Sequence, residues 1–285
     1  MTLGELYDAV AYLGFETELD EEVLRRGFYA VLGRALQTVD RLAPRTRRVT
    51  VSHIAPRAVA CRKEPMRIPD GGEWRLSLGE GRGMLVLSIF GTGKVLVRGE
   101  HGERELCFSS LGESRLAVPL SRENELVILA ERDVVLGGFG QYEEVSPLGE
   151  ILLDRGVSYD IRRLCPDFAG FASPCLYLDG KAYLGAYEIE GERIVLPETS
   201  PSRLYEVACR LAMPTFSPFD DPSLELPLSP LLTPLLPELV ASMIWLDDAP
   251  EKAAHYAAIY RENYLRVRAE MRSAGALSVI TSNGW

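Results

Sequence analysis

The sequence contains few of the residues that catalytic and metal sites usually need. Its 285 residues include three histidines, His53, His101 and His255, and no two of them have the spacing of metal ligands. The five cysteines are scattered and form no CxxC pair, which argues against a zinc site and against a disulfide framework. We therefore expect reduced thiols, no metal, no cofactor, and surface or core roles for the histidines.

Long apolar runs and clusters of positive charge are also missing. Four prolines interrupt the leucine-rich stretch 224–246, so no segment has the length of a membrane span. The first residues lack the pattern of a signal peptide, and we expect a protein made without export. A net charge of −10 argues against a nucleic-acid surface, because phosphate contacts need clustered lysine and arginine.

The sequence motifs of common enzymes fail at their decisive positions. A phosphate-binding loop at residues 91–94 would need glycine where Ser88 stands and a hydroxyl where Val95 stands. A serine elbow (GxSxG) is absent. The carboxylate pairs, such as 220–221 and 247–248, are adjacent, whereas glycosidase carboxylates must face each other across a cleft. We therefore expect no enzyme, while a calcium site made from scattered acids of the central region stays open.

Pattern and length predict an α+β protein of several domains. Both ends show helical periodicity, while residues 49–145 consist of short β-type runs separated by glycine-containing turns. We expect the N- and C-terminal helices to pack as one helical platform, with an antiparallel, jelly-roll-like β-sandwich inserted between them. The predicted segments are N-terminal helices at 1–48, the sandwich at 49–147, a mixed region with β-hairpins at 148–213, C-terminal helices at 214–273 and an irregular tail at 274–285.

The N-terminal helices carry recognisable signals. Thr2 and Glu5 have the spacing of a capping box for a short first helix. A second helix is expected from about residue 20 until Pro44. Gly27 and Gly33 lower its helix propensity, but they would allow another helix to approach closely.

The central region contains eight candidate strands. They are 49–54, 74–78, 84–90, 94–98, 105–108, 115–119, 125–130 and 133–136, with turns at 91–93 and 100–102; beyond them we expect hairpins at Asp179-Gly180 and Glu190-Gly191 and a strand at 204–211. This block resembles galactose-binding-like, carbohydrate-module-type sandwiches, chiefly in the sequence FGTGKVLV at 90–97 followed by a charged hairpin. Trp74 and Phe139 could form a sugar-stacking platform, although a tryptophan in the core is the simpler interpretation.

The C-terminal stretch 226–272 predicts a proline-interrupted apolar helix, an acidic turn and a long helix. Asp248 is placed as N-cap of the long helix, with Pro250 in its first turn and Glu251 as capping-box partner. One face of this helix is apolar, and it consists of Ala253, Tyr256, Tyr260, Tyr264, Val267 and Met271. Its tyrosines could pack on the N-terminal helices or form an interface with another molecule, where tyrosine is enriched.

This helix–turn–helix pattern resembles the C-terminal end of head–tail connector and neck proteins of tailed bacteriophages, and residues 6–15 and 27–39 resemble the opening helices of the same class. The resemblance implies a non-enzymatic virion structural protein of a phage or prophage, assembled in the bacterial host cytoplasm. It would form a ring homo-oligomer and contact neighbouring portal or tail proteins, with no membrane and no nucleic-acid recognition. The alternative is a carbohydrate-binding module of a phage tail or baseplate component.

Overall fold

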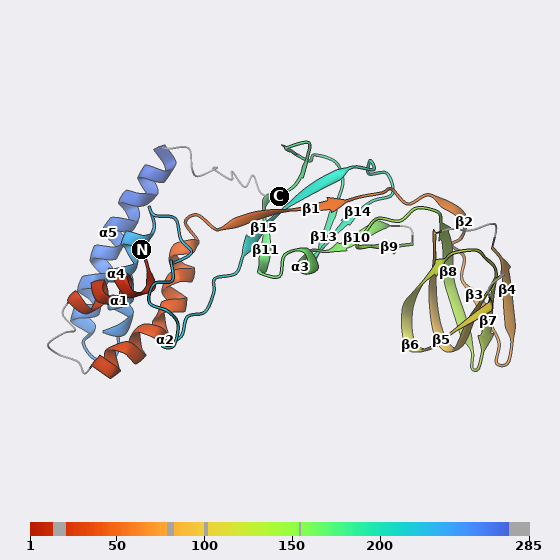
Figure 1. The fold of residues 1–285 in the computed structure, drawn as a ribbon, viewed down its shortest axis with the longest axis horizontal. Coiled ribbons are helices and arrows are strands. Elements are labelled where there is room, and N and C mark those ends of the chain that lie inside the picture. Colours follow the sequence, from red (N-terminus) through yellow and green to blue (C-terminus); the bar gives the residue numbers. More distant parts are fainter. Residues whose placement is uncertain (14–20, 79–82, 100–101, 154, 274–285) are drawn as a thin grey trace. The chain divides into compact units, whose positions relative to one another are not determined.

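The computed structural model describes residues 1–13, 21–78, 83–99, 102–153 and 155–273, and the chain divides into two compact units (Figure 1). The helical unit consists of Met1–Arg47, Asp167–Ser173 and Cys209–Trp285, and the β unit consists of Arg48–Pro166 and Pro174–Ala208. More of the described residues lie in strands than in helices, so the protein is mostly β, and the α+β prediction overstates the share of helix. No described helix is both long and apolar enough to cross a membrane.

Most helices belong to the helical unit. They are α1 (Leu3–Tyr12), α2 (Glu21–Asp40), the 3₁₀ turn η1 (Thr233–Leu235), α4 (Leu236–Ile244) and α5 (Pro250–Ser273), while the single-turn α3 (Ile161–Leu164) lies in the β unit. The capping box of α1 is confirmed, because the Glu5 amide donates to the Thr2 hydroxyl at 3.2 Å and the Thr2 amide donates to the Glu5 carboxylate at 2.8 Å. The apolar helix predicted from residue 226 begins only at Leu236, since the prolines before it lack the amide hydrogen that a helix interior needs.

The start of α5 differs from the prediction. Its first helical hydrogen bond runs from the amide of Ala253 to the carbonyl of Ala249, at 3.0 Å. Ala249 is therefore the N-cap and Pro250 the first helical residue, so Asp248 lies one position too early to cap the helix. Proline fits this first position because its missing amide hydrogen has no partner there in any helix.

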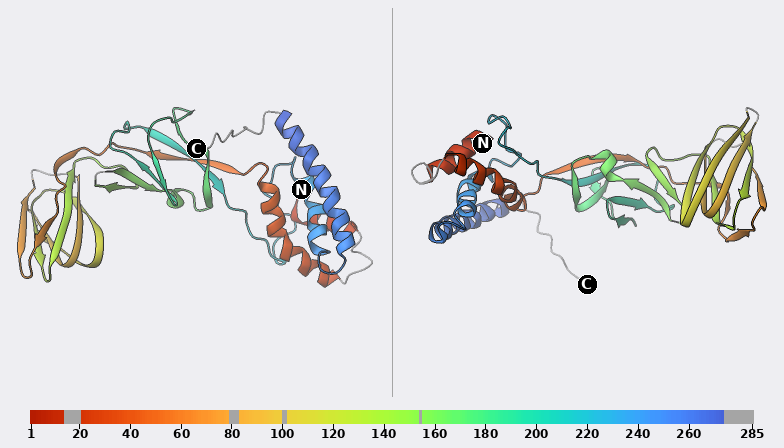
Figure 2. Two further views of the ribbon diagram at one scale, coloured as in Figure 1. Left: turned by 180° about the vertical axis from the view of Figure 1, so that it is seen from behind. Right: turned by 90° about the horizontal axis from the view of Figure 1, so that it is seen from below.

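One apolar core joins the helices from the two ends of the chain. Figure 2 shows the ribbons of these helices from two further sides. Its buried members include Leu6, Phe28, Leu36, Leu239, Val240 and Met271. A Cβ at Gly27 would lie 3.5 Å from Ile244, so this glycine lets α2 approach α4 closely. At Gly33 no described atom would come within 4 Å, so the predicted close approach occurs only at Gly27.

The main sheet of the β unit has the strand order β2-β8-β5-β7-β4, with β3 paired to β8 and β6 paired to β5. Its strands are β2 (Ala58–Arg62), β3 (Met66–Ile68), β4 (Glu73–Ser77), β5 (Gly83–Gly99), β6 (Gly102–Leu120), β7 (Glu123–Ala130) and β8 (Val134–Tyr142). β5 pairs with β8 through residues 84–90 and with β7 through residues 93–99. β6 pairs with both of these halves of β5. The β5–β6 pair therefore contributes to two layers, whose inward side chains form one core. Trp74 on β4 and Phe139 on β8 contact each other in this core, although β4 and β8 are not neighbours in the sheet.

The predicted turn at 91–93 is wrong, because β5 runs through this segment with only a bulge between Ile89 and Gly91. Gly91 has a φ of 116°, and a Cβ there would overlap the carbonyl oxygen of Asp133. Glycine is needed here for the close approach of a neighbouring strand rather than for chain reversal. Similarly, the strands predicted at 105–108 and 115–119 are parts of the single strand β6.

The remaining strands form two smaller sheets, with the orders β1-β15-β11-β12 and β13-β14-β10-β9. They are β1 (Thr46–Ser52), β9 (Gly149–Leu152), β10 (Gly156–Asp160), β11 (Phe168–Leu178), β12 (Lys181–Ala182), β13 (Glu188–Glu190), β14 (Arg193–Leu196) and β15 (Leu204–Leu211). β1 overlaps the strand predicted at 49–54, but it pairs with β15 rather than with a strand of the sandwich. The hairpin turn at Asp179-Gly180 is confirmed, with φ angles of 51° and 75°, and β15 coincides with the predicted strand at 204–211.

Candidate functional site

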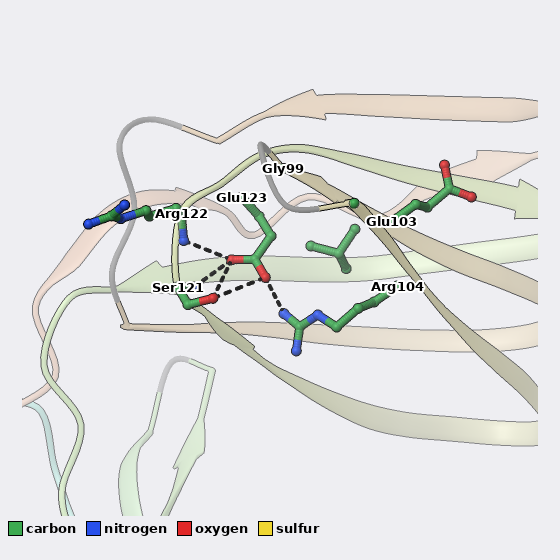
Figure 3. Close-up of a pocket in the computed structure, with 8 residues that line it drawn as sticks. Gly99, Glu103, Arg104, Ser121, Arg122 and Glu123 are labelled. Carbon is green, nitrogen blue, oxygen red and sulfur yellow. Dashed lines mark hydrogen bonds and ion pairs between the residues drawn. The ribbon is translucent and has the colours of Figure 1, made fainter.

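A hollow of about 280 Å³ lies at one end of the sandwich, where β5 leads into β6 and β6 leads into β7 (Figure 3). Its lining consists of Val97, Gly99, Gly102, Glu103, Arg104, Ser121, Arg122 and Glu123. Half of these residues are charged, so the hollow, which we call the end pocket, fits a polar rather than an apolar ligand.

The carboxylate of Glu123 holds the end pocket together. It is 9% exposed and accepts hydrogen bonds from the amides of Ser121 and Arg122, the second at 3.0 Å. Arg104 donates to it from Nη2 at 2.6 Å. Burial alone would raise the pKa of Glu123, but the amide hydrogen bonds and the charge of Arg104 outweigh it and lower the pKa to about 2. The carboxylate is therefore ionised at neutral pH and poorly suited to exchanging protons there.

The rim of the end pocket keeps unused hydrogen-bonding groups. Arg104 also donates from Nη2 to the carbonyl of Pro119 at 2.5 Å, so both of its bonds use the same nitrogen. Its Nε and Nη1 carry further N–H donors that have no partner within the described part of the chain. Glu103 accepts from Arg98 through Oε2 at 2.5 Å, which leaves its Oε1 available. The side chains of Glu103 and Arg122 point away from Glu123 (Figure 3), so a ligand would meet them at the edge.

The predicted aromatic pair, Trp74 and Phe139, lies in the core of the sandwich. The ring centroids are 5.6 Å apart and the ring planes are tilted by 50°. Phe139 is buried and Trp74 is half-buried. Because the two rings pack on each other from different layers, they do not present a flat surface to a sugar ring.

The apolar face predicted on α5 points into the helical unit. Its members are three buried residues, Ala253, Val267 and Met271, and three half-buried tyrosines, Tyr256, Tyr260 and Tyr264. The hydroxyl of Tyr256 donates to the carbonyl of Leu13, and burial raises the pKa of Tyr260. The structure thus places this face in packing within the chain.

His53 is buried, with 2% of its surface exposed. Its Nδ1 lies 2.9 Å from the hydroxyl of Tyr159, and its ring meets those of Tyr159 and Tyr205 edge-on. Burial lowers the pKa of His53, so the imidazole is neutral at pH 7. His255 is exposed on α5, and His101 lies outside the described residues. Within the described ranges, no three His, Cys, Asp or Glu side chains gather as metal ligands.

The end pocket is not evident in the amino-acid sequence. Arg104 and Glu123 are 19 positions apart, and only the pairing of β5 with β6 and β7 brings their turns together. The available signal is the Ser-Arg-Glu sequence at 121–123, since serine favours turns and a following acid can accept the free amides of a turn.

No protein-family model matches the chain, and no curated protein matches it. Among solved structures, a family 29 carbohydrate-binding module is similar at 14% identity over 35% of this chain and 93% of that chain, with a TM-score of 0.24. A cupin domain from Bordetella pertussis is similar at 16% identity over 35% of this chain and 96% of that chain, with a TM-score of 0.22. A putative α-L-fucosidase from Bacteroides ovatus shows 11% identity over 53% of this chain and 37% of its own, with a TM-score of 0.24. Similarity this low carries no argument about function, and it gives no support to the resemblance to phage connector proteins.

Proposed function

We propose that this protein is a non-enzymatic structural component of a tailed-phage or prophage virion, in the head–tail connector or neck. The observation that carries the proposal is the shared core of α1, α2, α4 and α5, because the connector interpretation requires the two ends of the chain to fold together. The β unit has a separate core of its own, so it would be a module inserted into the helical body.

The chemistry of the end pocket supports a non-catalytic role. The carboxylate of Glu123 is hydrogen-bonded to its own turn and to Arg104. We therefore expect neither this carboxylate nor the guanidinium of Arg104 to act as acid, base or nucleophile. His53 is buried against Tyr159 and closed to a substrate. The net charge of −10 favours protein partners over nucleic acid. The protein would assemble in the bacterial host cytoplasm and then form part of the virion.

The test is the mass of the purified full-length protein in solution, measured by light scattering after size-exclusion chromatography. We expect a ring of defined copy number, or a stable complex when portal and tail proteins encoded by neighbouring genes are added. A strict monomer that binds none of these proteins contradicts the proposal. Neighbouring genes for portal and capsid proteins would fit the neck, and neighbouring fibre genes would indicate the baseplate.

Carbohydrate recognition by the β unit, as a module of a tail or baseplate component, is the second candidate. The end pocket favours it, because the free N–H groups of Arg104 and the free oxygen of Glu103 can donate to and accept from sugar hydroxyls. Pockets that enclose small molecules begin at about 300 Å³, so this hollow would take a single sugar unit.

A glycan array tests this second function. Binding by the wild-type protein should be lost in Arg104→Lys, which removes the guanidinium donors but keeps the charge beside Glu123. Arg132→Ala, an exposed residue outside the pocket lining, should bind as the wild type does. If no glycan is bound, the second candidate is discarded, while the connector proposal is unaffected because it predicts no sugar binding.

A further inference from the structure

α5 carries a second face, which the core does not use. Its members are Ala254, Ala258, Arg261, Leu265, Arg268 and Arg272, which recur at intervals of three and four and are all exposed. At 3.6 residues per turn they occupy an arc of roughly 80°, centred about 120° from the buried face. We call it the arginine face.

The residues of the arginine face include no acid. Among the described residues, none of its three arginines forms an ion pair. The glutamates of the helix, Glu251, Glu262 and Glu270, lie outside the arc. Leu265 stands in the middle and is 58% exposed. Small alanines permit the close approach of another helix, and arginines bind carboxylates through two hydrogen bonds. This face is therefore suited to contact with a helix that carries acidic side chains.

α1 has the opposite pattern on its outer side. Glu5, Asp8 and Tyr12 lie on the face away from the buried Leu6 and Val10, and all three are exposed, Tyr12 by 83%. Glu5 is near one cation, the terminal amine of Met1 at 3.9 Å. Asp8 has no ion-pair partner within the described residues.

A neighbouring segment extends this acidic surface. The amide of Gly4 donates to the carbonyl of Pro222 at 2.8 Å, and the amide of Leu3 donates to the carbonyl of Leu224 at 2.9 Å. The segment therefore runs beside the start of α1 and brings two more exposed acids, Asp221 and Glu225. Glu5, Asp8, Tyr12, Asp221 and Glu225 together form what we call the acidic face. Arg25 donates to the carbonyl of Pro218, in the same segment.

The whole of α1 is about as long as the row of arginines on α5. The ten residues of α1 rise by about 15 Å, and the distance along α5 from Arg261 to Arg272 is about 16 Å. Within the described residues no ion pair joins α1 to α5, so each charged row remains available to another molecule.

We propose that the arginine face of α5 binds the acidic face of α1 in a second copy of this chain. The contact joins two different surfaces, so it is head-to-tail and can repeat until a ring closes. A chain with a net charge of −10 repels its own copies, and the pairing of opposite faces offsets this repulsion and fixes the orientation of the contact. The inference rests on the proposed assembly function, for which it names the contact surfaces.

A pair of matched variants tests the contact. Arg268→Glu changes the arginine face, whereas Arg266→Glu makes the same change two residues away, at a side chain that bonds Asn263 outside the arc. In sedimentation velocity at low salt, self-association should weaken about tenfold or more in Arg268→Glu and stay within about twofold of wild type in Arg266→Glu. Equal association of the two variants overturns the proposal.

Complementation separates a lost contact from a misfolded variant. R261E/R268E reverses one face and D8R/E225R reverses the other, so each protein alone should be monomeric and their mixture should associate again. A mixture that stays monomeric, although both variants unfold at the wild-type temperature, overturns the proposed contact. If the wild type forms rings and every variant does so too, the contact is wrong while the assembly function stands; a monomeric wild type overturns both.

Discussion

The imidazole Nδ1 of His53 lies 2.9 Å from the hydroxyl of Tyr159, although 106 positions separate the two residues in the chain. The same hydroxyl is 3.4 Å from the carbonyl of Ser52, and burial raises the pKa of Tyr159 to about 12. Both side chains are therefore neutral at physiological pH. Since His53 follows β1 and Tyr159 belongs to β10, their contact reports on the packing of two different sheets within the β unit.

Mild acid should destabilise the protein through His53. Burial lowers its pKa in the folded chain, so below about pH 6.5 the unfolded chain takes up the proton first. The free energy of unfolding should then decrease as the pH is lowered, and this group contributes at most about 1.4 kcal/mol per pH unit. Urea unfolding of wild type, His53→Gln and His255→Gln between pH 7.5 and 5.0 measures the effect. His53→Gln should flatten the dependence and the exposed His255→Gln should not; equal slopes in all three would exclude His53 as the cause.

Removing the charge of Glu123 should loosen the turn between β6 and β7. Glu123→Gln loses a buried ionised acceptor of the Ser121 and Arg122 amides and the partner of Arg104, so it should lower the free energy of unfolding by about 1–3 kcal/mol. The pKa of about 2 means that this contribution persists above pH 4.5 and is lost only as the pH falls toward 2. The control is Glu131→Gln, at an exposed residue. An equal decrease in its free energy of unfolding would show that Glu123 contributes no more than an exposed glutamate.

A side chain at residue 91 should strain the sandwich. Gly91→Ala places a Cβ onto the carbonyl oxygen of Asp133 at a φ of 116°, so it should cost at least about 1–3 kcal/mol of stability. Gly112→Ala, where no described atom lies within 4 Å of the added carbon, should change stability by less than about 0.5 kcal/mol. Thermal unfolding of both variants measures the difference. If Gly91→Ala were as stable as the wild type, the two strands could move apart without a loss of stability.

The two faces of α5 should respond differently to truncation. Met271→Ala removes a side chain that is 4% exposed in the helical core and should cost about 2–5 kcal/mol. Leu265→Ala, on the arginine face, should leave monomer stability within about 0.5 kcal/mol of wild type. Chemical unfolding at low protein concentration compares them without a contribution from assembly. A large loss in Leu265→Ala would show that its face is also packed within the chain.

Features set by nearby residues could be predicted from the sequence. The capping box of Thr2 and Glu5, the turn at Asp179-Gly180 and the strand β15 each depend on residues within a few positions, and each is found. The apolar face of α5 follows from helical periodicity alone. In contrast, the sequence pattern places the N-cap at Asp248, one residue too early, because Pro250 fits the first position of the helix as well as the second.

Features set by distant residues could not be predicted. Gly91 looks like a turn residue as long as its contact with the backbone of Asp133 is unknown, so the sequence pattern divides β5 into two strands. The partner of β1 is β15, more than a hundred positions later, and no local pattern encodes that choice. The end pocket is hidden for the same reason, since its charges come together only through strand register.

The single core shared by Leu6 and Met271 has a consequence for synthesis on the ribosome. The first two helices leave the exit tunnel long before their partners are translated, whereas the intervening β unit can complete its own core in the meantime. The nascent chain therefore carries uncovered apolar helices for most of translation, which is the stage at which a chaperone would be needed.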